Sequence, residues 1–309
     1  ICVDPTKLSR TEKQNLTRRY TSEISQFIGP AKDIPAPDMG TDGQTMAWLM
    51  DTYSQETGFA QPGVVTGKPL EIGGSAGRLG ATGLGVVFAA EKACEKLKIK
   101  FSEATLAVHG FGNVGLHAAL YAYERGTKVV AVSDVSGAIY NAKGLNIPDL
   151  IQWVKEKKVL KGYENAEVIS NEQLLALKVD VLAPCAIDGV IHQGNVNNIQ
   201  AKIIVEGANG PCTMDASKRL VERDVLTVPD ILANGGGVIV SYFEWVQGLS
   251  FFFWEEEEEN RKMKQIIVNA FAKVWEMKTD KKVDMRTAAM ATSVHRLERA
   301  MLLRGLYPR

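Results

Sequence analysis

The stretch Leu106-Ala107-Val108-His109-Gly110-Phe111-Gly112-Asn113-Val114-Gly115 decides the fold of this 309-residue chain. An apolar run that predicts a β-strand leads into Gly-x-Gly-x-x-Gly, and a helical pattern follows. The first glycine permits a tight turn, the second lets a ligand approach the backbone, and the third lets helix and strand pack closely. The helix N-terminus adds N–H donors and partial positive charge, so the stretch predicts a binding loop for a dinucleotide pyrophosphate. The residues predicted to contact the cofactor here are Gly110, Phe111, Gly112, Asn113, Val114 and Gly115.

Asp134 adds weight to this interpretation. It ends a second apolar run, residues 128–133, about 20 residues after Gly115, where dinucleotide sites place an acid that binds the ribose hydroxyls. Such an acid repels a 2′-phosphate, so the sequence favours NAD as cofactor. NADP remains open, because Ser133 and Ser136 are able to donate hydrogen bonds to a phosphate. The alternative is a chance set of glycines followed by a chance strand-end aspartate.

From residue 104 onward, predicted strands and helices alternate. The predicted strands are 104–109, 128–133, 179–183, 202–205 and 225–227, and the helices between them are 114–125, 147–157, 171–177 and 214–222. Short apolar strands separated by helices indicate a parallel sheet with helices on both faces. We therefore expect an α/β fold with a doubly wound, Rossmann-type cofactor domain, and part of a second α/β domain for the substrate.

The remaining chain predicts mostly helices. Helical patterns cover 6–29, where Ser9 and Glu12 form a capping box, 44–56 and 81–97, and a final helix begins near 284 and meets Gly305. Glycine-dense turns near residue 67 indicate a domain boundary. We expect residues 67–285 to form the dinucleotide-binding domain, and residues 1–66 with helix 286–309 to belong to the substrate and oligomerisation domain.

Composition excludes several classes of protein. Lys plus Arg and Asp plus Glu each total 36, which argues against a nucleic-acid or anionic-membrane partner. No apolar run approaches the roughly 20 residues that span a bilayer. The four cysteines and four histidines are scattered, so we expect no metal site and no disulfide framework, and a reducing compartment such as the cytoplasm.

Glu255 to Glu259 form an acidic run that has two interpretations. An acidic interaction segment is one. The favoured one is the first turn of a helix that continues through Val274, because negative charge stabilises a helix N-terminus.

Several longer motifs, in order, give the chain a family resemblance. They are Asp33-Ile34-Pro35-Ala36-Pro37-Asp38-Met39-Gly40-Thr41, Thr66-Gly67-Lys68-Pro69, Gly73-Gly74-Ser75-Ala76-Gly77-Arg78, the glycine loop, Glu206-Gly207-Ala208-Asn209-Gly210-Pro211, and Val240-Ser241-Tyr242-Phe243-Glu244-Trp245. With them the chain resembles the hexameric glutamate dehydrogenases of the Glu/Leu/Phe/Val dehydrogenase superfamily. The resemblance implies oxidative deamination of L-glutamate to 2-oxoglutarate and ammonia by a homo-hexamer, with a hydride passed to a nicotinamide cofactor.

The resemblance also implies roles for individual residues. Asp38 matches the catalytic aspartate that shuttles protons at the substrate amine; the plainer interpretation is a turn residue after Pro37. Ser241 matches the serine that binds the side-chain carboxylate of glutamate, and it also suits a helix N-cap.

Other residues match positions near the nicotinamide. Thr82, Asn209 and Asn234 match cofactor contacts near the nicotinamide and its ribose, with a helix first turn and two loop caps as the alternatives. Arg78 fits an anion-binding residue and an ordinary structural arginine equally well.

The chain departs from the family pattern in one major way and two minor ones. The family carries a Gly-Gly-x-Lys-Gly-Gly segment, with a catalytic lysine, immediately ahead of the Ile-x-x-Asp-Pro that opens this chain at Ile1. We expect residues ahead of Ile1 to supply it; a non-catalytic dinucleotide-binding fragment or assembly subunit is the alternative, and a dehydrogenase for another amino acid such as leucine is a third. His109 stands where glutamine is usual, and Gly235 where alanine is usual.

Overall fold

The computed structural model describes residues 1–305, which pack as two compact units. Unit 1 comprises Ile1–Leu79 and Gly237–Met263, and unit 2 comprises Gly80–Gly236 and the chain from Lys264 onward. This division differs from the predicted domain bounds, because residues 237–263 pack in unit 1 and the last helix packs in unit 2. The predicted division into substrate and cofactor domains remains a prediction about function.

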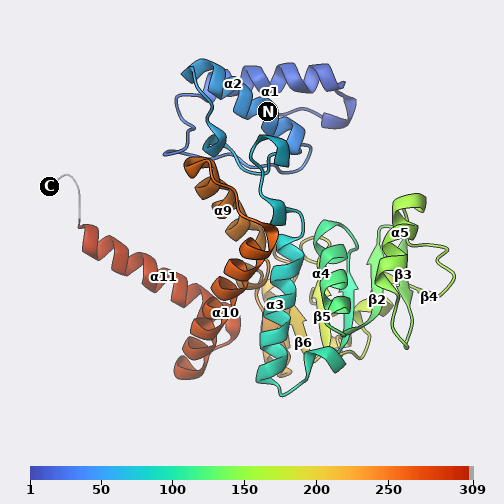
Figure 1. Cartoon of the computed structure of the whole chain (residues 1–309). Helices are drawn as coiled ribbons and strands as arrows, with labels where there is room; N and C mark the ends of the chain where they lie inside the picture. The colour runs from blue at the N-terminus through green and yellow to red at the C-terminus, as the bar shows by residue number, and fades with distance from the viewer. Residues whose placement is uncertain (306–309) are drawn as a thin grey trace. The chain divides into compact units, whose positions relative to one another are not determined.

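Helices and strands follow one another along the chain as Figure 1 shows. The α-helices are α1 (Arg10–Ile24), α2 (Gly43–Thr57), α3 (Ala81–Lys96), α4 (Asn113–Glu124), α5 (Ile147–Lys157), α6 (Asn171–Leu175), α7 (Met214–Glu222), α8 (Asp230–Ala233), α9 (Gly236–Ser250), α10 (Glu256–Lys281) and α11 (Met285–Arg304). The strands are β1 (Thr105–His109), β2 (Lys128–Asp134), β3 (Gly137–Tyr140), β4 (Glu167–Ile169), β5 (Val181–Pro184), β6 (Ile203–Val205) and β7 (Leu226–Val228).

Unit 2 is built on one sheet, which has seven strands within the described residues, in the order β4-β3-β2-β1-β5-β6-β7. Strand β1 pairs in parallel with β2 and β5, and β5, β6 and β7 continue the parallel ladder. The strand order reverses beside β1, and ligands of open α/β sheets bind at such a point, outside the carboxyl ends of the strands. The predicted doubly wound α/β fold is confirmed.

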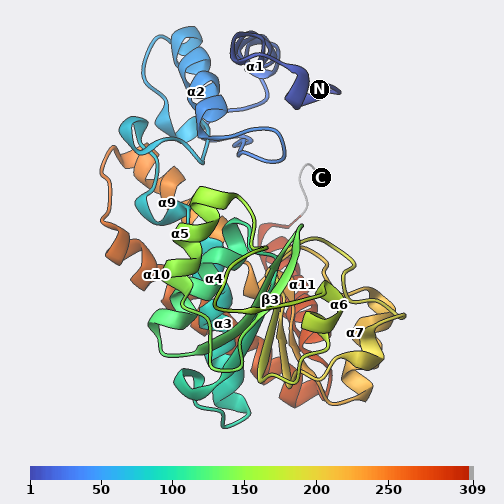
Figure 2. The same ribbon diagram turned by 90° about the vertical axis from the view of Figure 1, so that its right-hand side faces the viewer.

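Apolar side chains alternate between the two faces of this sheet. Leu106 and Val108 of β1 pack in the core beneath α3 and α4, whereas Ala107 between them packs beneath α6 and α7. Figure 2 shows these helix pairs on opposite sides of the strands. The first core also contains Phe271 of α10 and Met285 of α11, so the C-terminal helices complete unit 2.

The other edge of the sheet was not predicted. Strands β3 and β4 add to β2 in antiparallel fashion. They escaped prediction because their formation depends on pairing with a neighbouring strand already in place. Val168 in β4 is 59% exposed, so β4 is not a buried apolar run like β1 and β2.

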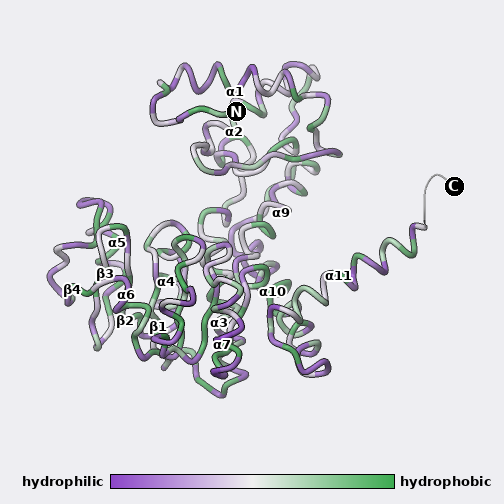
Figure 3. Tube along the Cα trace, turned by 180° about the vertical axis from the view of Figure 1, so that it is seen from behind, coloured by the Kyte–Doolittle hydropathy of each residue, from purple (hydrophilic) through white to green (hydrophobic). Residues whose placement is uncertain are grey.

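Unit 1 consists of helices and turns around a small core formed by Ile28, Met46, Leu49, Val64 and Val65. Its first helix is shorter than the predicted 6–29: a short 3-10 turn covers Pro5–Lys7, and α1 begins only after Ser9. The predicted capping box is confirmed, with Ser9 accepting from the Glu12 N–H and Glu12 accepting from the Ser9 N–H. Figure 3 shows α1 as largely hydrophilic, unlike the strands of unit 2.

Two other predicted helix boundaries are confirmed closely. The acidic run opens α10 at Glu256, and α11 ends at Arg304 with Gly305 as its C-cap. Within residues 1–305, no helix combines the length and the apolar character needed to cross a membrane.

Candidate functional site

The glycine loop lies at the carboxyl end of β1 in unit 2. A Cβ at Gly115 would lie 1.8 Å from the Gly110 carbonyl oxygen, so the helix and the turn approach too closely for a side chain. Gly110 has a φ of +98°, and a Cβ there would lie 2.7 Å from Ala186, just after β5. A Cβ at Gly112 would meet no described heavy atom within 4 Å. The space beside Gly112, at the start of α4, is therefore open to a ligand, as a pyrophosphate requires.

Asp134 ends β2, as predicted, and its carboxylate already holds two loops. Its Oδ1 accepts from the N–H of Ser136 at 2.7 Å and from the Ser136 hydroxyl, and its Oδ2 accepts from the Leu160 N–H at 2.8 Å. Ser133 is buried and its hydroxyl accepts from the Gly110 N–H at 3.1 Å. The structure therefore argues against phosphate donation by either serine, because the Ser133 hydroxyl is buried and the Ser136 hydroxyl already donates its proton to Asp134.

Of the residues predicted near the nicotinamide, the structure brings Asn209 and Asn234 into contact in unit 2. The Asn234 amide donates from Nδ2 to Oδ1 of Asn209 at 2.7 Å, which joins the loop after β6 to the end of α8. Thr82 lies in the first turn of α3, and a Cβ at the adjacent Gly83 would lie 2.7 Å from the Val114 carbonyl oxygen. The start of α3 therefore packs directly against the helix that follows the glycine loop.

Unit 2 also contains a buried ion pair, formed by Glu206 and Arg286. Glu206, which is fully buried, receives hydrogen bonds from Nη2 of Arg286 at 2.5 and 2.6 Å. Arg286 also contacts Asp230 through Nη1 at 3.2 Å. Burial raises the pKa of Glu206 above its usual value, and the positive charge of Arg286 opposes that rise. The sequence pattern predicted none of these contacts.

Unit 1 carries the other two predicted site residues. Asp38 is exposed at the start of a turn in which the N–H and the hydroxyl of Thr41 both donate to the Asp38 carbonyl. The turn is held against a second loop, because the Thr66 N–H donates to the Pro35 carbonyl, and a Cβ at Gly67 would lie 2.5 Å from Pro37. Asp38 is thus both a turn residue and an accessible carboxylate.

Ser241 lies within α9, half-buried, one turn before Glu244. Its predicted alternative role as a helix N-cap is wrong, because the helix begins five residues earlier, at Gly236. Glu244 accepts from the backbone N–H groups of Gly67 and Lys68 and from Nζ of Lys68 at 2.6 Å. Burial lowers the pKa of Lys68 and the carboxylate of Glu244 counteracts it. The same residues that support the Asp38 loop therefore bind the helix that carries Ser241.

A second buried carboxylate lies in unit 1. Glu259, one of the five consecutive glutamates, is fully buried and accepts hydrogen bonds from Ser75, Gly77 and Gln247. The acidic run thus opens a helix, as predicted, but one member supports the glycine-dense turn instead of facing solvent. Burial lowers the pKa of the neighbouring Arg78, whose Nε has no partner within the described part of the chain.

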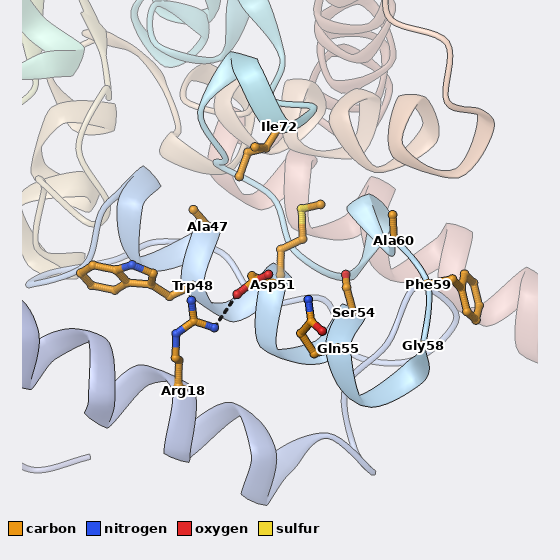
Figure 4. Close-up of a pocket in the computed structure, with 11 residues that line it drawn as sticks. Arg18, Ala47, Trp48, Asp51, Ser54, Gln55, Gly58, Phe59, Ala60 and Ile72 are labelled. Atoms are coloured by element: carbon orange, nitrogen blue, oxygen red, sulfur yellow. Dashed lines mark hydrogen bonds and ion pairs between the residues drawn. The ribbon is translucent and has the colours of Figure 1, made fainter.

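A surface pocket in unit 1 lies away from these residues. Figure 4 shows that α2 and the segment after it form most of its lining, and that Arg18 of α1 pairs with Asp51 there. The two side chains lie 2.6 Å apart. Neither Asp38 nor Ser241 lines it. Residues 1–305 contain no group of three or more His, Cys, Asp or Glu side chains arranged to hold a metal ion.

Comparison with known families gives two matches. The sequence model described as Glutamate/Leucine/Phenylalanine/Valine dehydrogenase matches residues 73–305. That described as the Glu/Leu/Phe/Val dehydrogenase dimerisation domain matches residues 1–55.

Individual proteins agree with the family matches. The chain is 51% identical to a glutamate dehydrogenase of Thermotoga maritima, over 100% of this chain and 74% of the relative. It is 46% identical to the catabolic NAD-specific glutamate dehydrogenase RocG of Bacillus subtilis, over 99% of this chain and 72% of the relative. Among solved structures, the leucine-bound hetero-hexameric glutamate dehydrogenase of Thermus thermophilus superposes with a TM-score of 0.92 at 38% identity, covering 99% of this chain and 73% of that one.

Proposed function

Because this chain belongs to the Glu/Leu/Phe/Val dehydrogenase family, we propose that it catalyses the reversible oxidative deamination of L-glutamate to 2-oxoglutarate and ammonia. The observation that carries the proposal is the 51% identity to a glutamate dehydrogenase over the whole of this chain. The family resemblance predicted from the motifs is confirmed. NAD is the proposed cofactor, since relatives of 46% identity are named NAD-specific.

The residues of unit 2 fit a dinucleotide. The space beside Gly112 is open at a helix N-terminus, where backbone N–H groups and the helix dipole bind the pyrophosphate. Asp134 lies at the strand end and favours free ribose hydroxyls over a 2′-phosphate. Asn209, Asn234 and Thr82 would hold the nicotinamide end.

The chemistry then divides among these groups. Bound NAD supplies the acceptor for the hydride that leaves the α-carbon of glutamate. Ser241 would donate a hydrogen bond to the side-chain carboxylate and so align the substrate. Asp38, an exposed carboxylate on a supported turn, would take a proton from the substrate ammonium and return protons as water adds and ammonia leaves. Each turnover consumes one water and releases ammonia with 2-oxoglutarate.

Assembly and location are further parts of the proposal. The match of residues 1–55 to a dimerisation domain supports an oligomer, and we propose a homo-hexamer. The Thermus relative is described as hetero-hexameric, so light scattering of the purified single chain is the appropriate test. A cytoplasmic location is proposed because Cys2, Cys94, Cys185 and Cys212 all remain free thiols.

The decisive experiment is a comparison of amino acids as reductants of NAD. The purified protein is incubated with NAD and either L-glutamate or L-leucine, and NADH formation is followed. Glutamate should support a far higher kcat/KM than leucine. A higher value with leucine would reassign the substrate, and no NADH formation with any amino acid would overturn the proposed activity.

A further inference from the structure

Resting on the proposed function, we propose that Arg286 is a positioning residue for the nicotinamide end of the cofactor, acting through Glu206 and Asp230. Arg286 lies in the first turn of α11, at the far end of the sequence from the glycine loop. It does not belong to any of the motifs that carry the family resemblance. Its role follows from three successive layers of contact within unit 2.

The first layer joins the guanidinium to two carboxylates. Nη2 of Arg286 donates to both oxygens of Glu206, and Nη1 lies 3.2 Å from Oδ1 of Asp230. The side chain of Glu206 has no exposed surface, so its negative charge depends on this partner. Two different nitrogens of one planar group thus hold two carboxylates at a fixed spacing.

The second layer joins the carboxylates to the loops after β6 and β7. Oε2 of Glu206 accepts from the Asp230 N–H at 2.8 Å, which fixes the start of α8. Oδ2 of Asp230 accepts from the Gly210 N–H at 2.8 Å, which fixes the loop after β6. Each acid therefore reaches across to the loop of the other strand.

The third layer is the asparagine pair. Asn209 directly precedes Gly210, and Asn234 ends α8 with its N–H donating to the Asp230 carbonyl at 3.0 Å. Their side chains meet at 2.7 Å. Both amides are consequently placed by backbone segments that Glu206 and Asp230 hold.

Arginine suits this position and lysine does not. The single nitrogen of a lysine ammonium satisfies one carboxylate but does not span both at this spacing. Arg286→Lys keeps the positive charge and most of the aliphatic stem, so it tests the spacing of the loops more than the presence of a charge. Asp230→Asn removes the charge at the other end of the network and serves as a second variant.

The experiment measures ligand binding without turnover. NADH and ADP, which lacks both the nicotinamide and its ribose, are titrated against the purified protein and its variants by fluorescence and calorimetry. Arg286→Lys should weaken NADH binding about tenfold, the size expected when one charge-assisted hydrogen bond is lost. ADP binding should change by less than about twofold, because the glycine loop and Asp134 hold the adenosine half. Asp230→Asn should show the same selective loss.

Arg125→Lys is the matched control. Arg125 pairs with Glu91 at 3.0 Å in the same unit, and its side chain is 29% exposed against 23% for Arg286. The Arg125→Lys variant should bind both ligands as tightly as the unaltered protein does. Equal weakening of NADH and ADP by Arg286→Lys would show a merely structural ion pair, and an unchanged NADH affinity would overturn the proposal outright. The activity proposal fails separately, if the unaltered protein binds NADH but does not oxidise glutamate.

Discussion

Lys68 and Glu244 lie 176 positions apart in the sequence and form an ion pair of 2.6 Å with no exposed side-chain surface on either residue. Glu244 also accepts two backbone N–H groups from the loop that contains Lys68. The pair therefore connects α9, which carries Ser241, to the loop that supports Asp38.

Breaking this pair should destabilise the protein strongly. Lys68→Met leaves the Glu244 carboxylate buried without its cation, which costs about 3–5 kcal/mol in the free energy of unfolding. The double variant Lys68→Met with Glu244→Gln should recover part of that loss, because no uncompensated charge remains. Denaturant unfolding measures both. Arg18→Met, at the more exposed pair with Asp51, should cost less than about 1 kcal/mol; equal costs at the two sites would contradict the expectation.

Ser241→Ala should raise the KM for glutamate while leaving NADH affinity unchanged. Loss of a hydrogen bond to a charged carboxylate predicts a fall in kcat/KM of about tenfold to a hundredfold. Steady-state kinetics and an NADH titration provide the two readouts. Ser250→Ala, at the end of the same helix, is the control and should behave as the unaltered enzyme. An unchanged KM in Ser241→Ala would remove this residue from the substrate site.

Gly112→Ala should separate ligand binding from folding. The φ of Gly112 is −78° and a Cβ would meet no described atom, so the free energy of unfolding should change by less than about 0.5 kcal/mol. The new methyl group would occupy the approach to the backbone and weaken NADH binding. Gly115→Ala, by contrast, should destabilise the fold, because its Cβ would overlap the Gly110 carbonyl. Full NADH affinity in Gly112→Ala would refute the predicted pyrophosphate site.

Asp134→Ala should narrow the preference for NAD over NADP, because the carboxylate that repels a 2′-phosphate is gone. The ratio of kcat/KM for the two cofactors is the measurement. Ser136→Ala removes one hydrogen bond to Asp134 but keeps its charge, so it controls for loosening of the loop. A ratio that stays the same in Asp134→Ala, or falls equally in Ser136→Ala, would assign cofactor choice elsewhere.

Because His109 is buried, we expect the folded protein to lose stability in acid. Burial lowers the pKa of this histidine, with Glu172 acting in the opposite direction, and its Nδ1 has no partner among residues 1–305. Below about pH 6.5 the unfolded chain therefore binds a proton that the folded protein does not, so stability falls as the pH drops. His109→Gln should lose less stability between pH 7 and about 5.5 than the unaltered protein. Urea unfolding at both pH values measures this, with exposed His295→Gln as the control; identical losses in all three proteins would contradict it.

Local pattern predicted the centre of the sheet well. Strands β1 and β2 are confirmed within a residue or two, because each is an apolar run that ends in a glycine loop or an acid. The capping box at Ser9 and the C-cap at Gly305 are local chemistry as well, and both are confirmed. Strands β3 and β4 carry no such signal, since their formation depends on pairing with a neighbour already in place.

Local sequence pattern was similarly limited at the candidate site, where it did not predict contacts between distant residues. The motifs located the glycine loop, Asp134 and the two asparagines, but not the buried charges behind them. Glu206 and Arg286 are 80 positions apart, so no sequence spacing relates them. Glu259 was concealed within a run of like residues, and only its packing distinguishes it from its four neighbours. Long-range charge pairing arises only in the folded chain, and no periodic pattern in the sequence reveals it.

The division of the chain at Leu79, Gly236 and Met263 bears on how the protein is made. Neither unit is a continuous piece of sequence, and the core of unit 2 includes Phe271 and Met285. A ribosome that has reached residue 236 has therefore synthesised every described strand of the sheet, but not the helices that cover part of it. One face of the nascent sheet therefore stays incompletely covered while all of α9 and the first turns of α10 are synthesised. A chaperone would matter most during this interval.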